Sequence, residues 1–169
     1  VNDLNINNLN ACFAFMGGGC RNYLGARQGV LVGGRCNCLK NSASCGFIGA
    51  GRGNTIGGSV TVSFIGSGQN NGICSNFGAI VGGCNNGICQ GFNASFIGAG
   101  VCNFITGSCS GILGGHDNQV DNHSDAFIMG SNITTIQSCT AYVNNFYSTG
   151  SNGASNVVIL ANLPTSDPG

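Results

Sequence analysis

The residues of this chain best suited to chemistry by their type are its eleven cysteines. Zinc sites of the ribbon type use Cys-x-x-Cys pairs, whereas the chain offers Cys36-Asn-Cys38 and the wider pair Cys84 and Cys89. These spacings predict no metal site. We interpret most of the cysteines as small, compact core residues, with a few disulfides if the protein works outside cells. Because eleven is odd, at least one thiol is free or paired between chains.

Two short segments bring His, Ser and Asp together, His116-Asp117 and His123-Ser124-Asp125. Immediate neighbours at a corner of the chain do not easily adopt the nucleophile–base–orienter geometry of a catalytic triad, and the chain has no Gly-x-Ser-x-Gly elbow. Glu is absent, which argues against the carboxylate pair of a polysaccharide-degrading enzyme. We therefore expect no catalytic residue, no cofactor and no enzymatic activity.

A repeat near 16 residues organises the chain. Eight glycines recur with spacings of 16 or 17 residues: Gly17, Gly33, Gly49, Gly66, Gly82, Gly98, Gly114 and Gly130. Two apolar residues precede each of them: Phe15-Met16, Leu31-Val32, Phe47-Ile48, Phe64-Ile65, Ile80-Val81, Phe96-Ile97, Ile112-Leu113 and Ile128-Met129.

A second signature, Asn-x-Leu/Ile/Val, follows most of these glycines. Its asparagines are Asn22, Asn37, Asn54, Asn71, Asn86, Asn103 and Asn118. The Asn lies five residues past the first Gly where the turn is Gly-x-Gly and four past it where the turn is Gly-Gly, so one residue dropped in the turn is restored later. We expect these asparagines to stack in a ladder, each amide bonding to the neighbouring coils.

These features predict an all-β fold, a β-solenoid of about eight 16-residue coils. β-Branched and aromatic residues between glycines favour short strands, and Gly in every helical window argues against helix. The net charge of zero argues against binding to nucleic acid or to anionic membrane. No continuous apolar run is long enough to predict insertion into a membrane.

The paired apolar residues predict self-association. Successive side chains of a strand point to opposite faces, so one member of each pair fills the coil and the other forms a second stripe that would face water. An exposed apolar stripe of that length marks an interface. We expect a parallel homotrimer with this stripe at its axis; a wide monomeric solenoid that holds both residues inside is the alternative.

Over residues 14–136, the repeated apolar-apolar-Gly and Asn-x-apolar units resemble the head repeats of trimeric autotransporter adhesins and the related β-rolls of phage tail fibres. The adhesin heads usually repeat at a shorter period, so the coil geometry should differ. Residues 141–147 and 162–169 resemble connector segments of virion fibre and tail proteins. The resemblance implies a structural fibre protein of a virus or phage.

We expect three segments along the chain: a partial first coil or N-terminal cap at 1–13, the solenoid at 14–136, and a connector at 137–169. Within the first segment, Asn7-Asn-Leu9 resembles the second signature. The chain begins at Val1 without an initiator Met or a leader, which indicates a processed product or a piece of a longer chain.

The expected role is the shaft of a virion tail or surface fibre that projects or forms a host-attachment appendage. Its partners would be its own copies, a neighbouring virion or fibre module, and a host cell-surface receptor. The first alternative is the head of a trimeric adhesin at the bacterial cell surface. A second alternative, an ice-binding solenoid, needs a flat Thr-x-Thr ladder, and Thr61 and Thr134-Thr135 do not repeat in register.

Charge is distributed unevenly along the predicted rod. The five basic residues, Arg21, Arg27, Arg35, Lys40 and Arg52, fall in the first four coils, and three of the five acids, Asp117, Asp121 and Asp125, fall in the last two. Since a solenoid maps sequence linearly onto space, the rod should be basic near one end and acidic near the other.

Overall fold

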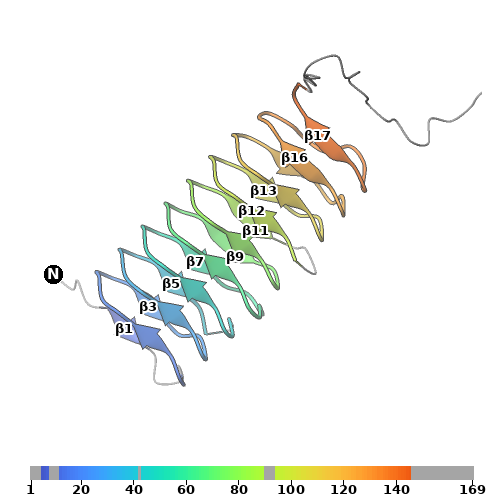
Figure 1. Ribbon diagram of the computed structural model, residues 1–169. Coiled ribbons are helices and arrows are strands. Elements are labelled where there is room, and N and C mark those ends of the chain that lie inside the picture. Colours follow the sequence, from blue (N-terminus) through green and yellow to red (C-terminus); the bar gives the residue numbers. More distant parts are fainter. Residues whose placement is uncertain (1–4, 8–11, 42, 90–93, 146–169) are drawn as a thin grey trace, which may run out of the picture.

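The computed structural model describes residues 5–7, 12–41, 43–89 and 94–145. These residues form a β-solenoid whose coils stack one on the next in sequence order (Figure 1). The described part of the chain contains no helix, and therefore none that is long and apolar enough to cross a membrane. The all-β solenoid predicted from the repeat is thus confirmed.

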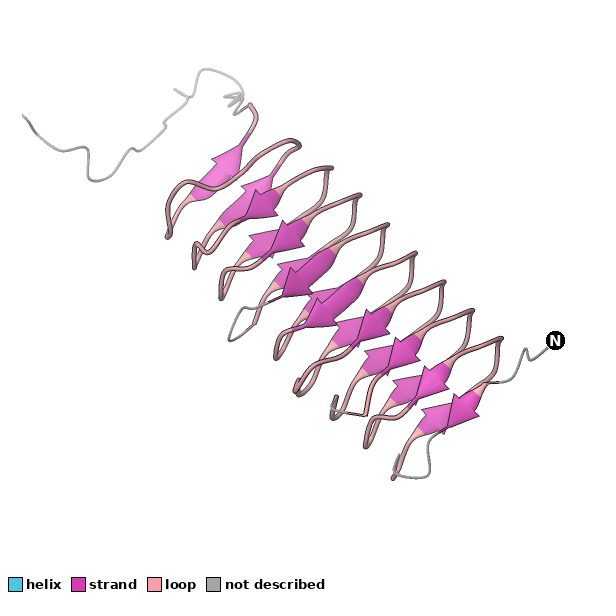
Figure 2. Ribbon diagram, turned by 180° about the vertical axis from the view of Figure 1, so that it is seen from behind, coloured by secondary structure: helices cyan, strands magenta, loops and turns pink. Residues whose placement is uncertain are grey.

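Each coil gives one strand to each of two parallel sheets, and Figure 2 shows the stacked strands from behind. The eight-stranded sheet contains β1 (Ile6–Asn7), β3 (Tyr23–Leu24), β5 (Cys38–Leu39), β7 (Thr55–Ile56), β9 (Gly72–Cys74), β11 (Gly87–Cys89), β13 (Phe104–Ile105) and β15 (Gln119–Val120). The nine-stranded sheet contains β2 (Phe15–Met16), β4 (Val30–Leu31), β6 (Phe47–Ile48), β8 (Phe64–Ile65), β10 (Ala79–Ile80), β12 (Phe96–Ile97), β14 (Gly111–Ile112), β16 (Phe127–Met129) and β17 (Ala141–Val143).

The core is one aliphatic side chain wide in each sheet. The eight-stranded sheet contributes Leu24, Leu39, Ile56, Ile73, Ile88, Ile105 and Val120, and the nine-stranded sheet contributes Leu31, Ile48, Ile65, Ile80, Ile97, Ile112 and Ile128. All of them are at most 2% exposed. Because every strand is only two or three residues long, one inward residue per strand is what each coil can bury. The repeated Leu, Ile or Val is therefore the residue that fills the interior of each coil.

Strand pairing corrects the alignment expected from the first glycine of each unit. Leu31 pairs with Ile48, so the residue level with Gly49 is Val32 and not Gly33. The inward residue is consequently the second member of some apolar pairs, as in Phe47-Ile48, and the first member of others, as in Leu31-Val32. The inward side chain is the constant reference point of the coil, and the first glycine is not.

The variation in coil length also lies at a different corner from the glycine turn in which the sequence predicted it. The second glycine of each turn stands three residues before the ladder Asn in every unit, as Gly34 does before Asn37 and Gly51 before Asn54. Nothing is dropped in this turn. The spacing varies at the opposite corner, between one sheet and the next coil, so that Met16 and Leu31 are 15 residues apart and Leu31 and Ile48 are 17 apart.

Each coil turns through two corner residues with left-handed backbone conformation. One column of corners includes Arg21, Cys36, Asn70, Asn85, Cys102 and Asp117; the other includes Phe13, Gln28, Cys45, Val62, Phe77, Ala94, Cys109, Asp125 and Cys139. Positive φ is uncommon outside Gly, Asn and Asp. The second glycine of the turn before the ladder Asn is required both by its positive φ and by close packing. In one such turn, Gly68 has φ 101°, and a Cβ on it would lie 2.2 Å from the carbonyl oxygen of Gly83.

The asparagines form a continuous, buried hydrogen-bonded ladder. Each side-chain oxygen accepts the backbone N–H of the next asparagine, at 2.9–3.2 Å, for Asn22, Asn37, Asn54, Asn71, Asn86 and Asn103. Asn118 ends the ladder by accepting the N–H of Ile133 at 3.1 Å. The ladder begins one coil earlier than the sequence signature, because Asn5 accepts the N–H of Asn22 at 3.1 Å. It is Asn5-Ile6, not Asn7-Asn-Leu9, that supplies the first rung.

The described solenoid continues past residue 136, the boundary expected from the sequence, to β17. There Tyr142 takes the inward position, level with Ile128. Its hydroxyl accepts the N–H groups of Ile136 at 3.0 Å and Gln137 at 2.9 Å, and donates to the carbonyl oxygen of Gln137 at 3.0 Å. The hydroxyl of Tyr142 thus satisfies the polar groups of the neighbouring turn, while its ring packs against this end of the core. Most of the expected connector, residues 146–169, lies outside the described residues.

Candidate functional site

The outer face of the nine-stranded sheet carries two parallel columns of side chains on either side of the inward residue. The leading column contains Phe15, Val30, Phe47, Phe64, Ala79, Phe96, Gly111, Phe127 and Ala141. The trailing column contains Gly17, Val32, Gly49, Gly66, Val81, Gly98, Leu113, Met129 and Val143. We call this surface the apolar face.

The apolar face is exposed and hydrophobic along the whole described rod. Eight large side chains are between 37% and 57% exposed: Phe15, Val32, Phe64, Val81, Phe96, Leu113, Phe127 and Met129. Phe47 and Phe64 stack within the leading column, with ring centroids 5.2 Å apart. Neither column contains a charged residue. A contiguous apolar surface of this kind on a folded chain is typical of a binding interface.

The two members of each expected apolar pair lie on opposite faces of their strand. Leu31, Ile48, Ile65, Ile80, Ile97, Ile112 and Ile128 are buried, and Met16 is partly buried against the same core. Their pair partners Phe15, Val32, Phe47, Phe64, Val81, Phe96, Leu113 and Met129 all lie on the apolar face. The structure therefore assigns one stripe to the core and leaves the other at the surface.

The outer face of the eight-stranded sheet differs in chemistry. Its outward positions include Tyr23, Lys40, Thr55, Gln119 and Asp121 beside glycines and cysteines, and also the exposed Ile6 and Phe104. A shallow hollow of about 250 Å³ lies on it, lined by Lys40, Thr55, Gly57, Gly72, Cys74 and Cys89 among others. This face is chemically mixed, so in the described part of the chain the continuous apolar surface lies on the nine-stranded sheet.

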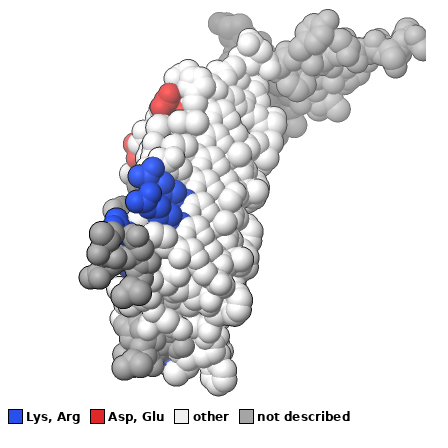
Figure 3. Space-filling model, turned by 90° about the vertical axis from the view of Figure 1, so that its left-hand side faces the viewer, with Lys and Arg blue, Asp and Glu red and all other residues white. Residues whose placement is uncertain are grey.

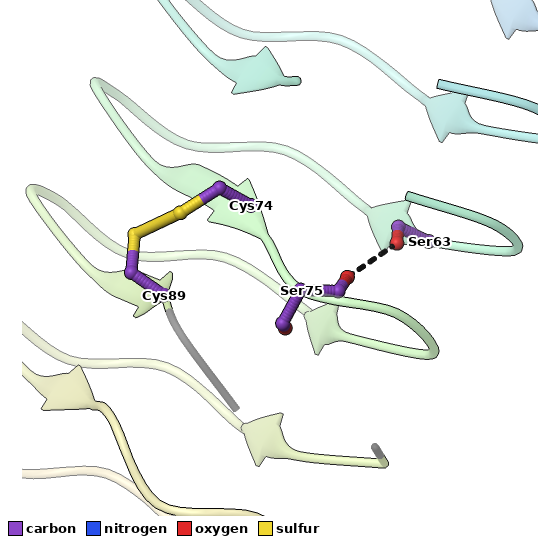
Figure 4. The surroundings of a disulfide bond; sticks show 4 residues. All are labelled: Ser63, Cys74, Ser75 and Cys89. Carbon is purple, nitrogen blue, oxygen red and sulfur yellow. Dashed lines mark hydrogen bonds between the residues drawn. A yellow bond between two sulfur atoms is a disulfide. The ribbon is translucent and has the colours of Figure 1, made fainter. Parts of the chain in front are cut away.

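One disulfide joins neighbouring coils on the eight-stranded sheet. Cys74 of β9 and Cys89 of β11 are level in the sheet, with their Cα atoms 4.9 Å apart (Figure 4). Nearby, the hydroxyl of Ser63 donates to the carbonyl oxygen of Ser75 at 3.1 Å, while the buried hydroxyl of Ser75 has no protein partner. The bond ties two rungs of the sheet that the backbone already pairs.

The expectation that most cysteines fill the core is wrong. Among the described residues, Cys12, Cys36, Cys45, Cys109 and Cys139 are exposed, and Cys20, Cys38, Cys84 and Cys102 are partly exposed. Four of the exposed ones, Cys36, Cys45, Cys109 and Cys139, are corner residues with positive φ. The inward positions are taken by larger aliphatic side chains, so Cys is used at corners and outward positions instead.

The acidity of the Cys38 thiol departs clearly from that of an ordinary thiol. Burial raises the pKa of Cys38 above 9.0, and the nearby positive charge of Lys40 opposes part of that effect. A raised pKa keeps the thiol protonated near neutral pH, and a protonated thiol is a poor nucleophile. Cys38 therefore occupies a partly buried outward position of β5, where burial disfavours its thiolate form.

The segments containing His, Ser and Asp make local contacts. The Nδ1 atom of His116 lies 3.0 Å from a carboxylate oxygen of Asp117, its neighbour in the chain. The Nδ1 atom of His123 lies 2.9 Å from the hydroxyl of Thr135 rather than that of Ser124. The described ranges hold no group of three or more His, Cys, Asp or Glu side chains close enough to share a metal ion.

Charged side chains are absent from both columns of the apolar face and follow the order of the sequence along the rod. Figure 3 shows Lys and Arg atoms nearer the N-terminal end of the rod than the Asp atoms. Arg35 and Arg52 are level in adjacent coils. Each directly follows the second glycine of the turn and stands two residues before the ladder Asn. Asp117, Asp121 and Asp125 lie in the coils that contain β15 and β16. The rod thus has a basic portion and an acidic portion.

Together these observations define the chain as a β-solenoid repeat protein with one apolar face. No family model matches the chain, and no curated protein matches it.

Proposed function

We propose that this chain is a non-enzymatic structural rod, the shaft of a viral or phage tail or surface fibre, which assembles as a parallel homotrimer through its apolar face. The observation that supports this most directly is the uncharged, half-exposed outer surface of the nine-stranded sheet, which extends from Phe15 to Val143. A rod that repeats one coil along its length is suited to spanning distance. About eight coils at about 4.8 Å each give roughly 38 Å per module.

Burial of the apolar face would provide the driving force for assembly. A fully buried Phe, Leu, Val or Met side chain contributes about 1.5–3 kcal/mol, and the eight large side chains of this face are already about half covered. Completing their burial would contribute on the order of 8 kcal/mol per chain before the costs of ordering and of lost rotational freedom. This gross gain is of the same order as the cost of association, about 4–15 kcal/mol, so burial supplies the driving force and the quality of packing decides the affinity.

The alternative of a bacterial surface adhesin uses the same architecture and the same face. The DNA that flanks the gene separates the two roles. Capsid and tail genes beside it are the expected finding for a fibre shaft, whereas a membrane anchor encoded further along the same reading frame would favour the adhesin. In either role, the partners we propose are copies of this chain, an adjoining module and a host cell-surface receptor.

The ice-binding alternative receives no support from the outward columns. Thr55 and Thr134 share one column of the eight-stranded sheet, but Gly72, Gly87, Phe104 and Gln119 lie between them. A regular threonine lattice is therefore missing from the described part of that face. On the opposite sheet the outward columns contain Phe, Val, Ala, Gly, Leu and Met and no threonine.

A further inference from the structure

The apolar face has a pattern that specifies how copies of the chain meet. In β6, β8 and β12 the leading column carries Phe and the trailing column carries Gly. In β10 and β14 the order is reversed, with Ala79 or Gly111 leading and Val81 or Leu113 trailing. Most coils thus present one large and one small residue, and the column that holds the large residue is not the same in all coils.

Building on the proposed self-association, we propose that copies of this chain associate parallel and in register about an axis along the rod, so that each large residue packs against the small residue of the same coil in its neighbour. Rotation about such an axis keeps every coil at its own height. It also brings the leading column of one copy against the trailing column of the next, for two copies or for three.

This arrangement satisfies the pattern coil by coil. Phe64 of one copy meets Gly66 of its neighbour, Phe96 meets Gly98, and Val81 meets Ala79. Two coils depart from it: β4 carries Val30 and Val32, and β16 carries Phe127 and Met129. In the second case the ring of Phe127 occupies the space over Gly111, where a Cβ would lie 2.4 Å from the ring. The excess bulk of β16 therefore fills a gap in the adjoining coil.

An antiparallel arrangement fits the same face less well. Centred on β10, it would set Phe64 against Phe96 and Gly66 against Gly98, which places two rings together and leaves a void beside them. It would, however, bring the basic coils of one copy beside the acidic coils of the other. The two arrangements therefore differ in their expected dependence on salt, because charge attraction between copies is screened as the salt concentration rises.

The test changes one coil at its leading position. The trailing glycines are unsuitable targets, since a Cβ on Gly66 would lie 2.5 Å from the carbonyl oxygen of Val81 in the same chain. Ala79→Phe instead gives β10 a large residue in both columns, and Ala79→Phe combined with Val81→Gly restores one large and one small residue. Gln119→Phe, an exposed outward position of β15, is the matched control on the other sheet.

Association is measured by fluorescence-detected sedimentation over a dilution series, with circular dichroism to establish that every variant is folded. We expect Ala79→Phe to weaken association at least tenfold, the double variant to restore it to within about threefold of wild type, and Gln119→Phe to have no effect. Association should be unchanged or tighter between about 0.05 M and about 0.5 M NaCl.

Two results would overturn the in-register arrangement while leaving self-association intact. One is wild-type-like assembly by Ala79→Phe, and the other is assembly that weakens strongly with salt, as the antiparallel arrangement requires. A wild-type chain that stays monomeric at all concentrations would instead contradict the proposed function itself. The two failures are therefore distinguishable in one experiment.

Discussion

The side-chain oxygen of Asn71 accepts a hydrogen bond from the backbone N–H of Asn86 at 3.0 Å, although the two residues are 15 positions apart in the chain. The Nδ2 group of the same amide donates to the carbonyl oxygens of Ser67 in its own coil and Gly83 in the next, both at 3.1 Å. One buried side chain thus satisfies three backbone groups across two coils. This relationship recurs along the rod and fixes the shape of the turn that precedes each strand of the eight-stranded sheet.

Replacing a ladder asparagine should therefore be costly. Asn71→Ala removes the acceptor of the Asn86 N–H and a donor to two carbonyl groups, all inside the coil. Since an unsatisfied buried polar group costs about 1–3 kcal/mol, we expect the free energy of unfolding to fall by about 3 kcal/mol. Guanidinium unfolding followed by circular dichroism measures this. Gln69→Ala, two residues earlier and exposed, is the control and should be close to wild type.

The ladder could be predicted from the sequence because seven asparagines recur at one position of successive units. The register of the other strand could not. Gly33 and Gly49 look equivalent in the sequence, yet Gly49 lies level with Val32. The residue that decides the alignment is the inward one, and a Leu-Val or Phe-Ile pair does not reveal which member points inward. Only strand pairing shows it.

The corner at Val62 offers a test with the opposite sign. Val62 is β-branched, about half exposed and has φ of 50°, a conformation that costs most residues about 1–2 kcal/mol and that Asn tolerates better. We expect Val62→Asn to raise the free energy of unfolding by about 1 kcal/mol, which corresponds to about 2–4 °C in Tm for a domain of this size. Val101→Asn, at an exposed position with ordinary φ, should give no such gain; an equal gain there would show that left-handed strain is not the cause.

The disulfide should stabilise the rod through the unfolded chain. Cys74 and Cys89 are separated by 15 residues, and closing a loop of this size removes unfolded-state entropy worth about 3 kcal/mol. We expect Cys74→Ser with Cys89→Ser to lower the free energy of unfolding by up to this amount, measured by denaturant titration without reductant. Cys109→Ser, at an exposed corner, should leave stability unchanged. Equal stability of the double variant and wild type would contradict a structural role for the bond.

Alkaline pH should weaken the fold partly through Cys38. Its pKa is raised in the folded state by burial, so above the ordinary thiol pKa the unfolded chain loses this proton while the folded chain keeps it. The contribution of Cys38 to the free energy of unfolding is then fully present below pH 9.0, and it is lost as the pH rises above that value. In the presence of a phosphine reductant, Cys38→Ser should show a shallower loss of stability than wild type between about pH 8 and about pH 10. Parallel curves for the two proteins would contradict the assignment.

The role of cysteine shows where sequence reasoning lacked information. The small size of Cys suggested a place in the core. The inward positions instead hold Leu, Ile or Val, whose larger side chains fill a core one residue wide. Several cysteines stand at corners with positive φ. The pairing of Cys74 with Cys89 depends on β9 and β11 being level in the sheet, which strand pairing shows. By contrast, an apolar stripe outside the core follows from any strand with two adjacent large apolar residues, and the structure has it.

The mass of the assembled protein in solution is the most direct test of trimeric assembly through the apolar face. Sedimentation equilibrium at micromolar concentrations should give three times the chain mass of 17.0 kDa, which is about 51 kDa. A mass of two chains would keep the apolar face as an interface but contradict the three-fold arrangement. A single species of 17.0 kDa at every concentration, with the apolar face still exposed, would contradict the account.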